Sequence, residues 1–475
     1  MQHHSMQQIR AVPCSGLLST AGMLIFCCMA LSFTGCSVHT VDPNPEPPLA
    51  VQPVFPSTTE IQDFKEPTTE AWWMAFSDPQ LNELIKRGFA QNYSIQEAVA
   101  RLDQARALTV QSRAARLPQV DIVGESGQRW FEGGEERRLN WAGVEFTWEV
   151  DIFNRLGSQA LARQSEQQAR REEVEAVRLR LSAEIAEAYF DAVGWHLQLA
   201  LLNNQIATDL DLLELTQLRF DSGLTASVDV LQQSSQLAEA QSLVPPVEGA
   251  LRVSENRLDV LLGESPDGRD RVPASSSFVD IGALPFVGVP ADLLLDRPDL
   301  RALRSELVAA DAEIGAAIAD RFPQITLDGS FLYEDGLEPG GVVFSLVGTF
   351  IQPLIDWGAR KAEVERNQAL YVERLARFTQ TFLEAVEDVE NSLYLERQQR
   401  EFLKRLERRR AFLEETLEKT TERYTGGLTD FLPVLAAVNE LQRLERVIVQ
   451  QERALLSFRI QLHRALGGSL GSEQT

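Results

Sequence analysis

Sulfur is nearly absent from most of this chain. Cysteine occurs only within the first 36 residues, at Cys14, Cys27, Cys28 and Cys36, and Met74 is the only methionine that follows them. Disulfides and thiolate metal sites are therefore excluded from residues 37–475. A relay of soft metal ions, which would need Cys or Met side chains, is not expected there.

Basic charge and clustered histidine are also lacking. The formal net charge is −24 and the pI is about 4.7, so nucleic acid, which needs a basic face, is excluded as a partner. The histidines are His3, His4, His39, His196 and His463. We expect His196, beside a tryptophan in a helical stretch, to be packed or solvated rather than a ligand. No nucleotide-binding, HExxH, GxSxG or calcium-loop pattern occurs. The sequence therefore predicts no catalytic residues, no cofactor and no metal site.

A long hydrophobic run is missing as well. The most apolar stretch, residues 17–31, follows Arg10, is short for a membrane-spanning helix and precedes small residues, which is typical of a secretory signal peptide. With Cys36 at its end, it resembles a bacterial lipoprotein signal, although Phe33 stands where such signals carry an aliphatic residue. The resemblance implies cleavage before Cys36, lipid on that cysteine and, because Ser37 rather than Asp follows, sorting to the outer membrane. An uncleaved anchor is the alternative.

Proline is concentrated just after this signal. Six prolines fall within residues 41–56, which predicts an extended spacer rather than a domain. We expect residues 36–70 to be a lipidated tether or an arm along the protein surface, and the two interpretations are compatible.

The rest of the chain repeats itself once, at an offset of 204 or 205 residues. ARLPQV at 115–120 returns as DRFPQI at 320–325, RFDSGLTASVDVL at 219–231 as RYTGGLTDFLPVL at 423–435, and LLG at 261–263 as ALG at 465–467. This predicts two copies of a helix, a β-hairpin and a long helical hairpin, at residues 71–263 and 299–467. A Pro-, Gly- and Ser-rich segment, 264–298, connects them, and 468–475 form a tail.

Proline is absent from residues 158–220, and Gly194 is the only glycine there. Apolar or small residues recur every seven positions in two rows. The first row is Ile185, Ala192, Leu199, Ile206, Leu213 and Phe220; the second is Val174, Leu181, Ala188, Trp195 and Leu202. They predict a coiled-coil helix about 90–100 Å long, which must pack on neighbouring helices along its length.

Each long helix is expected to turn back at a glycine in the left-handed conformation, at Gly223 and at Gly426-Gly427. Pro245-Pro246 predicts a break or bend in the first returning helix. A new helix is expected to begin near Pro298.

Strict alternation predicts strands that resemble those of a membrane barrel. Within residues 141–152, one face would carry Ala142, Val144, Phe146, Trp148, Val150 and Ile152, and the other Gly143, Glu145, Thr147, Glu149 and Asp151. A soluble sheet with one wet face alternates in the same way, but a hairpin at the matching place in the second repeat favours the membrane. There residues 324–333 alternate, whereas residues 342–354 alternate poorly. Four strands cannot close a membrane barrel, so several chains would share one.

The opening WWMAFSDPQLNELIKRGFAQN at residues 72–92 and the two RF/RY-x-x-GL turns resemble the TolC-like outer-membrane factors, in particular the lipoprotein branch that serves RND-type efflux pumps. The resemblance covers nearly the whole mature chain. It implies a mainly α fold with membrane β: helical hairpins forming a periplasmic α-barrel, and four strands per protomer of a shared, trimeric twelve-stranded β-barrel. It also implies a homotrimer among outer-membrane lipid, with a periplasmic adaptor and an inner-membrane RND transporter as partners.

The resemblance places candidate site residues at the two helical tips, which would form the periplasmic mouth. The expected adaptor-docking residues are Arg219, Gly223, Leu224, Thr225, Arg423, Gly427, Leu428 and Thr429. Capping explains the glycines, but not the arginines or the Leu-Thr pairs. The acidic strand residues Glu145, Glu149 and Asp151 would line the lumen and favour cations, while Val144, Phe146, Trp148 and Val150 would face lipid.

The expected gate departs from the family pattern. Leu432 matches a leucine that narrows the mouth in the family, but the aspartate that usually follows one turn later is replaced by Ala436. We therefore expect an apolar constriction at Leu432, with Asp430 as the nearest remaining acid. Pro433 is expected to distort the start of this helix.

These observations favour a passive exit channel of an efflux pump, which is not an enzyme. A coiled-coil surface scaffold or adhesin with soluble hairpins, and a duct for type I protein secretion, are the alternatives.

Overall fold

The computed structural model describes residues 37–49, 53–58, 71–130, 132–133, 136–335 and 341–470. Cys36 and the signal segment lie outside them. The chain divides into two compact units. The first combines the described residues before 42 with residues 112–159 and 313–365; the second combines residues 42–111, 160–312 and 366–470. None of the helices in the described part of the chain has both the length and the apolar composition that crossing a membrane requires.

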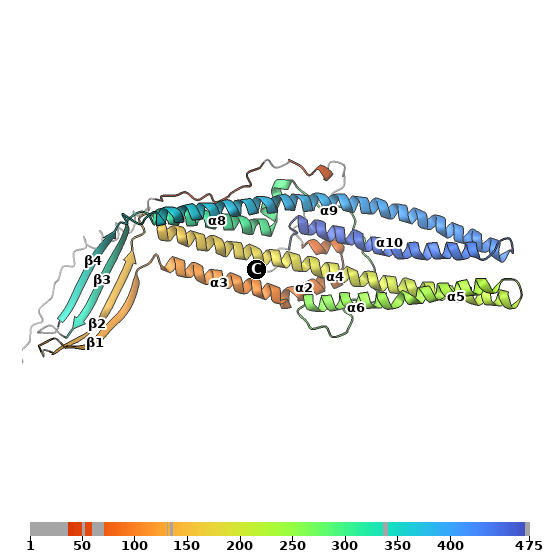
Figure 1. The fold of residues 1–475 in the computed structure, drawn as a ribbon, viewed down its shortest axis with the longest axis horizontal. Coiled ribbons are helices and arrows are strands. Elements are labelled where there is room, and N and C mark those ends of the chain that lie inside the picture. Colours follow the sequence, from red (N-terminus) through yellow and green to blue (C-terminus); the bar gives the residue numbers. More distant parts are fainter. Residues whose placement is uncertain are drawn as a thin grey trace, which may run out of the picture. The chain divides into compact units, whose positions relative to one another are not determined.

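The helices occur twice in the same order (Figure 1). The first set is α2 (Pro79–Gln91), α3 (Tyr93–Ala114), α4 (Arg155–Asp221), α5 (Ser227–Ser242) and α6 (Val244–Leu261). After the short α7 (Leu293–Asp296) come α8 (Pro298–Ala319), α9 (Ala359–Thr425) and α10 (Leu432–Ala465). Short 3-10 helices lie at Pro56–Thr58, Trp72–Phe76 and Pro290–Asp292. The matched helices α4 and α9 are each 67 residues long, as the repeat predicts.

Helix boundaries follow proline and local capping. The first returning helix breaks at Leu243, between α5 and α6, which confirms the break expected at Pro245-Pro246. The helix expected near Pro298 begins there as α8. The distortion expected at Pro433 is wrong: α10 begins at Leu432, so Pro433 lies in its first turn, where a missing N–H loses no intrahelical bond.

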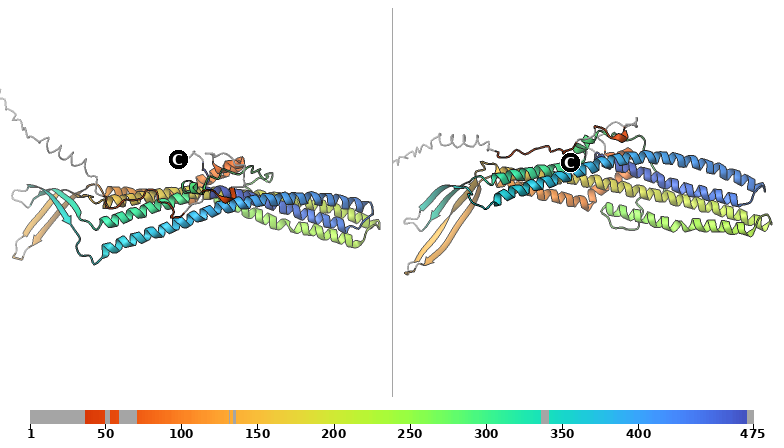
Figure 2. Two further views of the ribbon diagram at one scale, coloured as in Figure 1. Left: turned by 90° about the horizontal axis from the view of Figure 1, so that it is seen from above. Right: turned by 45° about the horizontal axis from the view of Figure 1, so that its top comes forward.

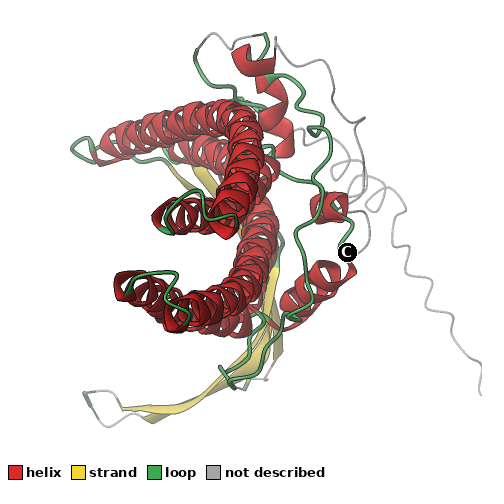
Figure 3. Ribbon diagram, turned by 90° about the vertical axis from the view of Figure 1, so that its right-hand side faces the viewer, coloured by secondary structure: helices red, strands yellow, loops and turns green. Residues whose placement is uncertain are grey.

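Both hairpin turns are closed by glycine at positive φ, 71° at Gly223 and 69° at Gly427. The amide of Leu224 donates to the carbonyl of Arg219 at 2.8 Å, and the amide of Leu428 donates to that of Arg423 at 2.8 Å. These bonds satisfy carbonyls that the helix ends leave open. The left-handed caps are thus confirmed at both tips, which Figure 3 shows end-on.

The four strands form one antiparallel sheet in chain order (Figure 2). They are β1 (Gln119–Trp130), β2 (Glu136–Glu149), β3 (Gln324–Glu334) and β4 (Gly341–Ile351). The register aligns like with like. One row across the sheet is Ile122, Val144, Phe331 and Phe344, and the adjacent row is Asp121, Glu145, Ser330 and Ser345. Because side chains alternate between faces, one face is apolar and the other largely polar.

Two buried cores stabilise the second unit. In one, Trp72 donates its indole N–H to the Ser182 hydroxyl at 3.0 Å and stacks on His463, with ring centroids 5.4 Å apart. In the other, Phe55 is fully buried among side chains of α8, α9 and α10. The described part of the proline-rich segment therefore lies as an arm against the helices, as one of its two interpretations predicted.

Candidate functional site

The predicted docking residues all lie at the two hairpin tips. Leu224 and Leu428 are both exposed, at 66% and 73%. The Thr225 hydroxyl donates to the Asp229 carboxylate in the first turn of α5, so this threonine is tied to the start of that helix. Capping does not require the side chains of these two leucines, which are exposed at equivalent places in both repeats. They are therefore available to a partner.

The two tip arginines, equivalent in sequence, have different surroundings. The guanidinium carbon of Arg219 lies 4.4 Å from the centroid of the Tyr424 ring, and that ring is buried against Phe431, with centroids 5.3 Å apart. Arg423 is exposed. A cation over an aromatic face contributes about 0.5–2 kcal/mol, depending on its burial. Arg219 therefore joins one hairpin to the other, a role that sequence reasoning missed, as it missed Tyr424.

Leu432 is separate from the apolar cluster next to it. That cluster consists of Tyr424, Phe431, Val434, Leu435 and Val438. Leu432 itself is 58% exposed, and Ala436, one turn later, and Asp430 are exposed as well. The side chain of Leu432 is therefore not part of this core.

A polar network crosses the helices above the tips. Asp209 of α4 is fully buried, and its carboxylate accepts a bond from the Gln442 amide of α10 at 3.1 Å. Gln442 also accepts from Gln236 of α5 at 3.2 Å, and Gln205 of α4 donates to the Gln442 backbone carbonyl at 3.1 Å. One oxygen of Asp209 has no partner among the described residues. Burial raises the pKa of the Asp209 carboxyl, against the opposing bond from Gln442.

The network was missed because the two heptad rows were followed only while they stayed apolar. The second row, one member of which is Leu202, continues at the same spacing to Asp209 and Thr216. These two residues are as buried as Leu202. Following the seven-residue spacing regardless of side-chain polarity would have predicted that Asp209 and Thr216 are buried.

The acidic face of the sheet is only partly free. Glu145 lies in the polar row between Asp121 and Ser330. Glu149 is held by Arg155, whose guanidinium donates to both carboxylate oxygens at 2.6 and 2.8 Å. Asp151 lies beyond the end of β2.

The Asp151 carboxylate accepts the amides of Leu156 and Gly157 at 3.1 and 2.7 Å, so it caps α4. Of the expected lumen-facing residues Glu145, Glu149 and Asp151, two are thus engaged within the described chain, Glu149 by an arginine and Asp151 by the start of α4.

The expected lipid-facing residues also differ in their position along β2. Val144 is in the middle of the sheet and exposed, and the Phe146 ring covers Gly329 of the next strand. Trp148 is near the end of β2, where its indole N–H donates to the carbonyl of Arg116 at 3.1 Å. Val150 follows the strand, and its amide donates to the carbonyl of Ile325 at 2.8 Å.

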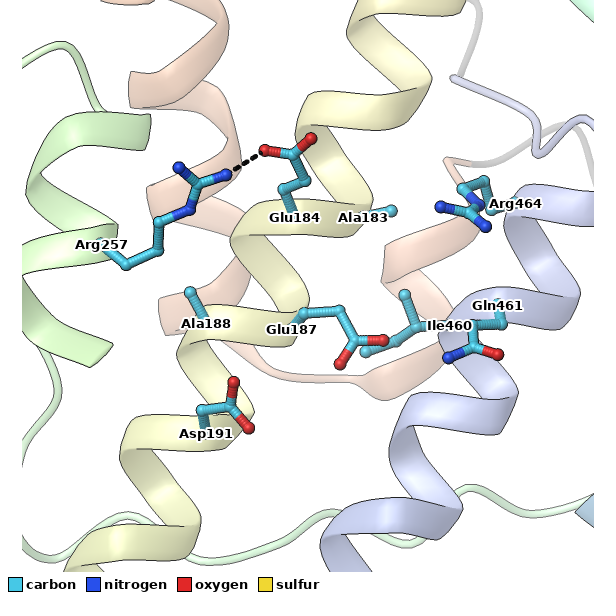
Figure 4. A pocket seen from close by; sticks show the side chains of 9 residues that line it. All are labelled: Ala183, Glu184, Glu187, Ala188, Asp191, Arg257, Ile460, Gln461 and Arg464. Atoms are coloured by element: carbon cyan, nitrogen blue, oxygen red, sulfur yellow. Dashed lines mark hydrogen bonds and ion pairs between the residues drawn. The ribbon is translucent and has the colours of Figure 1, made fainter. Parts of the chain in front are cut away.

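A small hollow of ≈250 Å³ lies between α4, α6 and α10 (Figure 4). Glu184, Glu187 and Asp191 reach toward it from α4, but each is paired. Arg257 of α6 contacts Glu184 at 2.7 Å, and Arg453 of α10 contacts both Glu187 and Asp191. The charges hold helices together, and the described residues contain no cluster of ligands suited to a metal ion.

The structure thus combines an antiparallel sheet that has one apolar face with long paired helices. Residues 84–264 and 289–468 match the model of a family described as outer membrane efflux protein. These residues are most of the chain, and it belongs to this family.

Known proteins agree along nearly the whole length. Nodulation protein T of Rhizobium leguminosarum bv. trifolii is 29% identical over 427 residues, which cover 87% of this chain and 90% of that protein. The pyoverdine export outer membrane protein OpmQ of Pseudomonas aeruginosa is 27% identical, over 95% of this chain and 97% of its own. The structure of the outer-membrane channel OprN superimposes with a TM-score of 0.83 at 27% identity, covering 91% of this chain and 99% of that one.

The resemblance seen in the sequence is thus confirmed, and so is the fold class: helical hairpins of an α-barrel and four strands of a shared trimeric β-barrel. The chain is an outer-membrane efflux channel.

Proposed function

We propose that this channel passively conducts small organic toxic compounds, delivered by a periplasmic adaptor and an inner-membrane RND-type transporter. The observation that carries the proposal is the pair of matched tips with exposed Leu224 and Leu428, which offer a repeated docking surface. Relatives are named for the export of pyoverdine and of toluene, and another for a cation efflux system. Only Met74 supplies a soft ligand beyond Cys36, which favours organic cargo over soft metal ions.

Deleting the gene should raise the accumulation of some compounds in a panel of dyes, antibiotics and solvents, and the wild-type gene should reverse this. A double variant, Leu224→Asp with Leu428→Asp, should remain a trimer in the outer membrane but fail to restore export, because charged tips cannot make an apolar contact with an adaptor. Leu295→Asp, at an exposed leucine of α7, is the matched control and should restore export. Unchanged accumulation of every compound, together with the loss of a secreted protein, would instead support the protein-secretion alternative.

We propose further that Cys36 is the lipidated mature N-terminus. Two acyl chains anchor a protein firmly, and the arm that follows is fixed to the helices by Phe55. Mass spectrometry of the purified protein should find a diacylated or triacylated Cys36 as its first residue. An unmodified Cys36, or cleavage at another position, would contradict this. Cys36→Ser, given a cleavable signal, should still be found in the outer membrane because the strands remain.

A further inference from the structure

The buried carboxyl of Asp209 on α4 has one oxygen with a partner and one without. Its Oδ1 accepts a hydrogen bond from Gln442 of α10 at 3.1 Å, whereas Oδ2 has no hydrogen-bond partner in the part of the chain that the structure describes. The side chain is fully buried. A buried carboxylate without a full set of partners is costly, and such groups neutralise by binding a proton.

Gln233 of α5 lacks a partner on the other side of the same contact. Its side chain is fully buried, and its Nε2 donates to the backbone carbonyl of Asp209 at 3.0 Å. Because a carbonyl only accepts, this bond fixes the orientation of the amide and leaves Oε1 as its other end. Among the described residues, Oε1 has no donor. Two buried acceptors, on two residues already in contact, therefore both lack a donor.

We propose that Asp209 is a proton-binding site, in which a proton taken from water is held on Oδ2 and the resulting hydroxyl donates to Oε1 of Gln233. One proton satisfies both acceptors and removes the buried charge, while Oδ1 continues to accept from Gln442. Loss of the proton to water restores the carboxylate and leaves both oxygens without a donor. The inference goes beyond the proposed cargo and partners and depends on neither.

The charged groups near Asp209 oppose one another. Arg446 of α10 favours the ionised form of the carboxyl, and Glu239 of α5 disfavours it. The Arg446 guanidinium donates to Oε1 of Gln205 at 2.6 Å, and Nε2 of the same glutamine donates to Glu445 at 3.0 Å. Arg446 is therefore engaged by Gln205, next to an acid of its own helix.

The proton should stabilise this part of the fold at low pH. Burial raises the pKa of the Asp209 carboxyl, against the hydrogen bonds from Gln442 and Gln233. Because the pKa is higher in the folded chain than in the unfolded one, the neutral form contributes fully below the ordinary value of 3.8. This contribution is lost as the pH rises through the pKa of the folded chain.

The position of the site relates it to the first hairpin. Asp209 lies on α4 about 20 Å before the turn at Gly223, and its partners lie on α5 and α10. A proton on Asp209 thus holds α5 on α4, and its release weakens the contact that supports the tip with the exposed Leu224. We expect the first hairpin to be rigid at low pH and looser at high pH.

Infrared spectra of the purified protein test the site directly. Between about pH 3 and about pH 9, the wild type should show a protonated-carboxyl band that persists above pH 3.8 and is absent from Asp209→Asn. Asparagine imitates the neutral acid, because its amide can donate to Gln233 and accept from Gln442. Asp211→Asn, the same change at an exposed aspartate, is the matched control and should keep the band. Gln233→Met removes the acceptor and should move the loss of the band to lower pH.

Hydrogen exchange tests the effect on the hairpin. Above the titration, amides of residues 205–240 should exchange at least about fivefold faster in the wild type than in Asp209→Asn, and below it the two should exchange equally. Comparison at the same pH cancels the pH dependence of the exchange chemistry. Amides of α2 should not differ between the two proteins.

The proton site is overturned if the spectra of the wild type and of Asp209→Asn titrate identically. Equal exchange at every pH would overturn the effect on the hairpin, and a band that moves to higher pH in Gln233→Met would overturn the assigned acceptor. If Asp209→Asn fails to form trimers on native gels, the comparison of Gln233→Met with the wild type decides.

Discussion

Leu432→Ser is expected to open the resting channel in planar bilayers by about tenfold or more, equivalent to lowering the barrier by at least about 1.4 kcal/mol. Three copies of Leu432 on the trimer axis would form an apolar ring, which blocks ions by dewetting without any charge. The structure favours this role because Leu432 is exposed beside a cluster that it does not join. A hydroxyl at that position would let water, and then ions, enter.

The matched variant is Asp430→Asn, two residues away on the same turn. Asp430 is exposed, and removing its charge should change the resting conductance little, while Leu432→Ile should leave the channel closed. If Asp430→Asn opens the channel and Leu432→Ser does not, the gate is an electrostatic ring and Leu432 is not the constriction.

Phe344→Arg is expected to destabilise the assembled channel by about 2–4 kcal/mol, the cost of a lipid-facing arginine near the middle of a membrane barrel. Phe344 lies opposite Phe331 in the central row of the apolar face. Trp148→Arg should cost less, because Trp148 is near the end of its strand and bonded to the carbonyl of Arg116. Denaturant unfolding in lipid vesicles measures both.

Ser345→Arg is the control for this prediction, because Ser345 neighbours Phe344 but belongs to the polar row. It should leave stability nearly unchanged while altering ion selectivity. Equal losses for Ser345→Arg and Phe344→Arg would show that the apolar face is not the one in contact with lipid.

Periodicity predicted most of the helices and strands, because backbone geometry fixes which positions share a face in a helix or a strand. The α4 helix and the alternation of β2 follow from it directly, whereas the two turns follow from glycine just past a helix end. Interactions between helices were not predictable in the same way. The Arg219 guanidinium lies over the ring of Tyr424, which belongs to the other hairpin. The Asp209 carboxylate accepts a hydrogen bond from Gln442, more than 230 positions away in the sequence. Such partners are set by packing, which one sequence does not display.

Errors at single residues came from reading a residue without its neighbours. Pro433 was expected to distort a helix, but its effect depends on the distance from the helix start, and it falls in the first turn. In the sequence, Asp151 continues the alternation of β2 and was therefore expected on the acidic face of the strand. In the structure its carboxylate caps α4 instead, because an acid just before a helix is drawn to the open amides of the first turn.

The equal length of α4 and α9 constrains how this protein can change. Both have 67 residues, so both hairpin turns of a chain follow their long helices after the same length, and a trimer would bring six such turns together. Four residues inserted into one helix alone would lengthen it by about 6 Å and leave every second turn protruding. We therefore expect insertions or deletions to be tolerated only when they change α4 and α9 equally. Changes of seven residues would also keep the apolar seam aligned. A change in the length of one long helix thus has to be matched by the same change in the other.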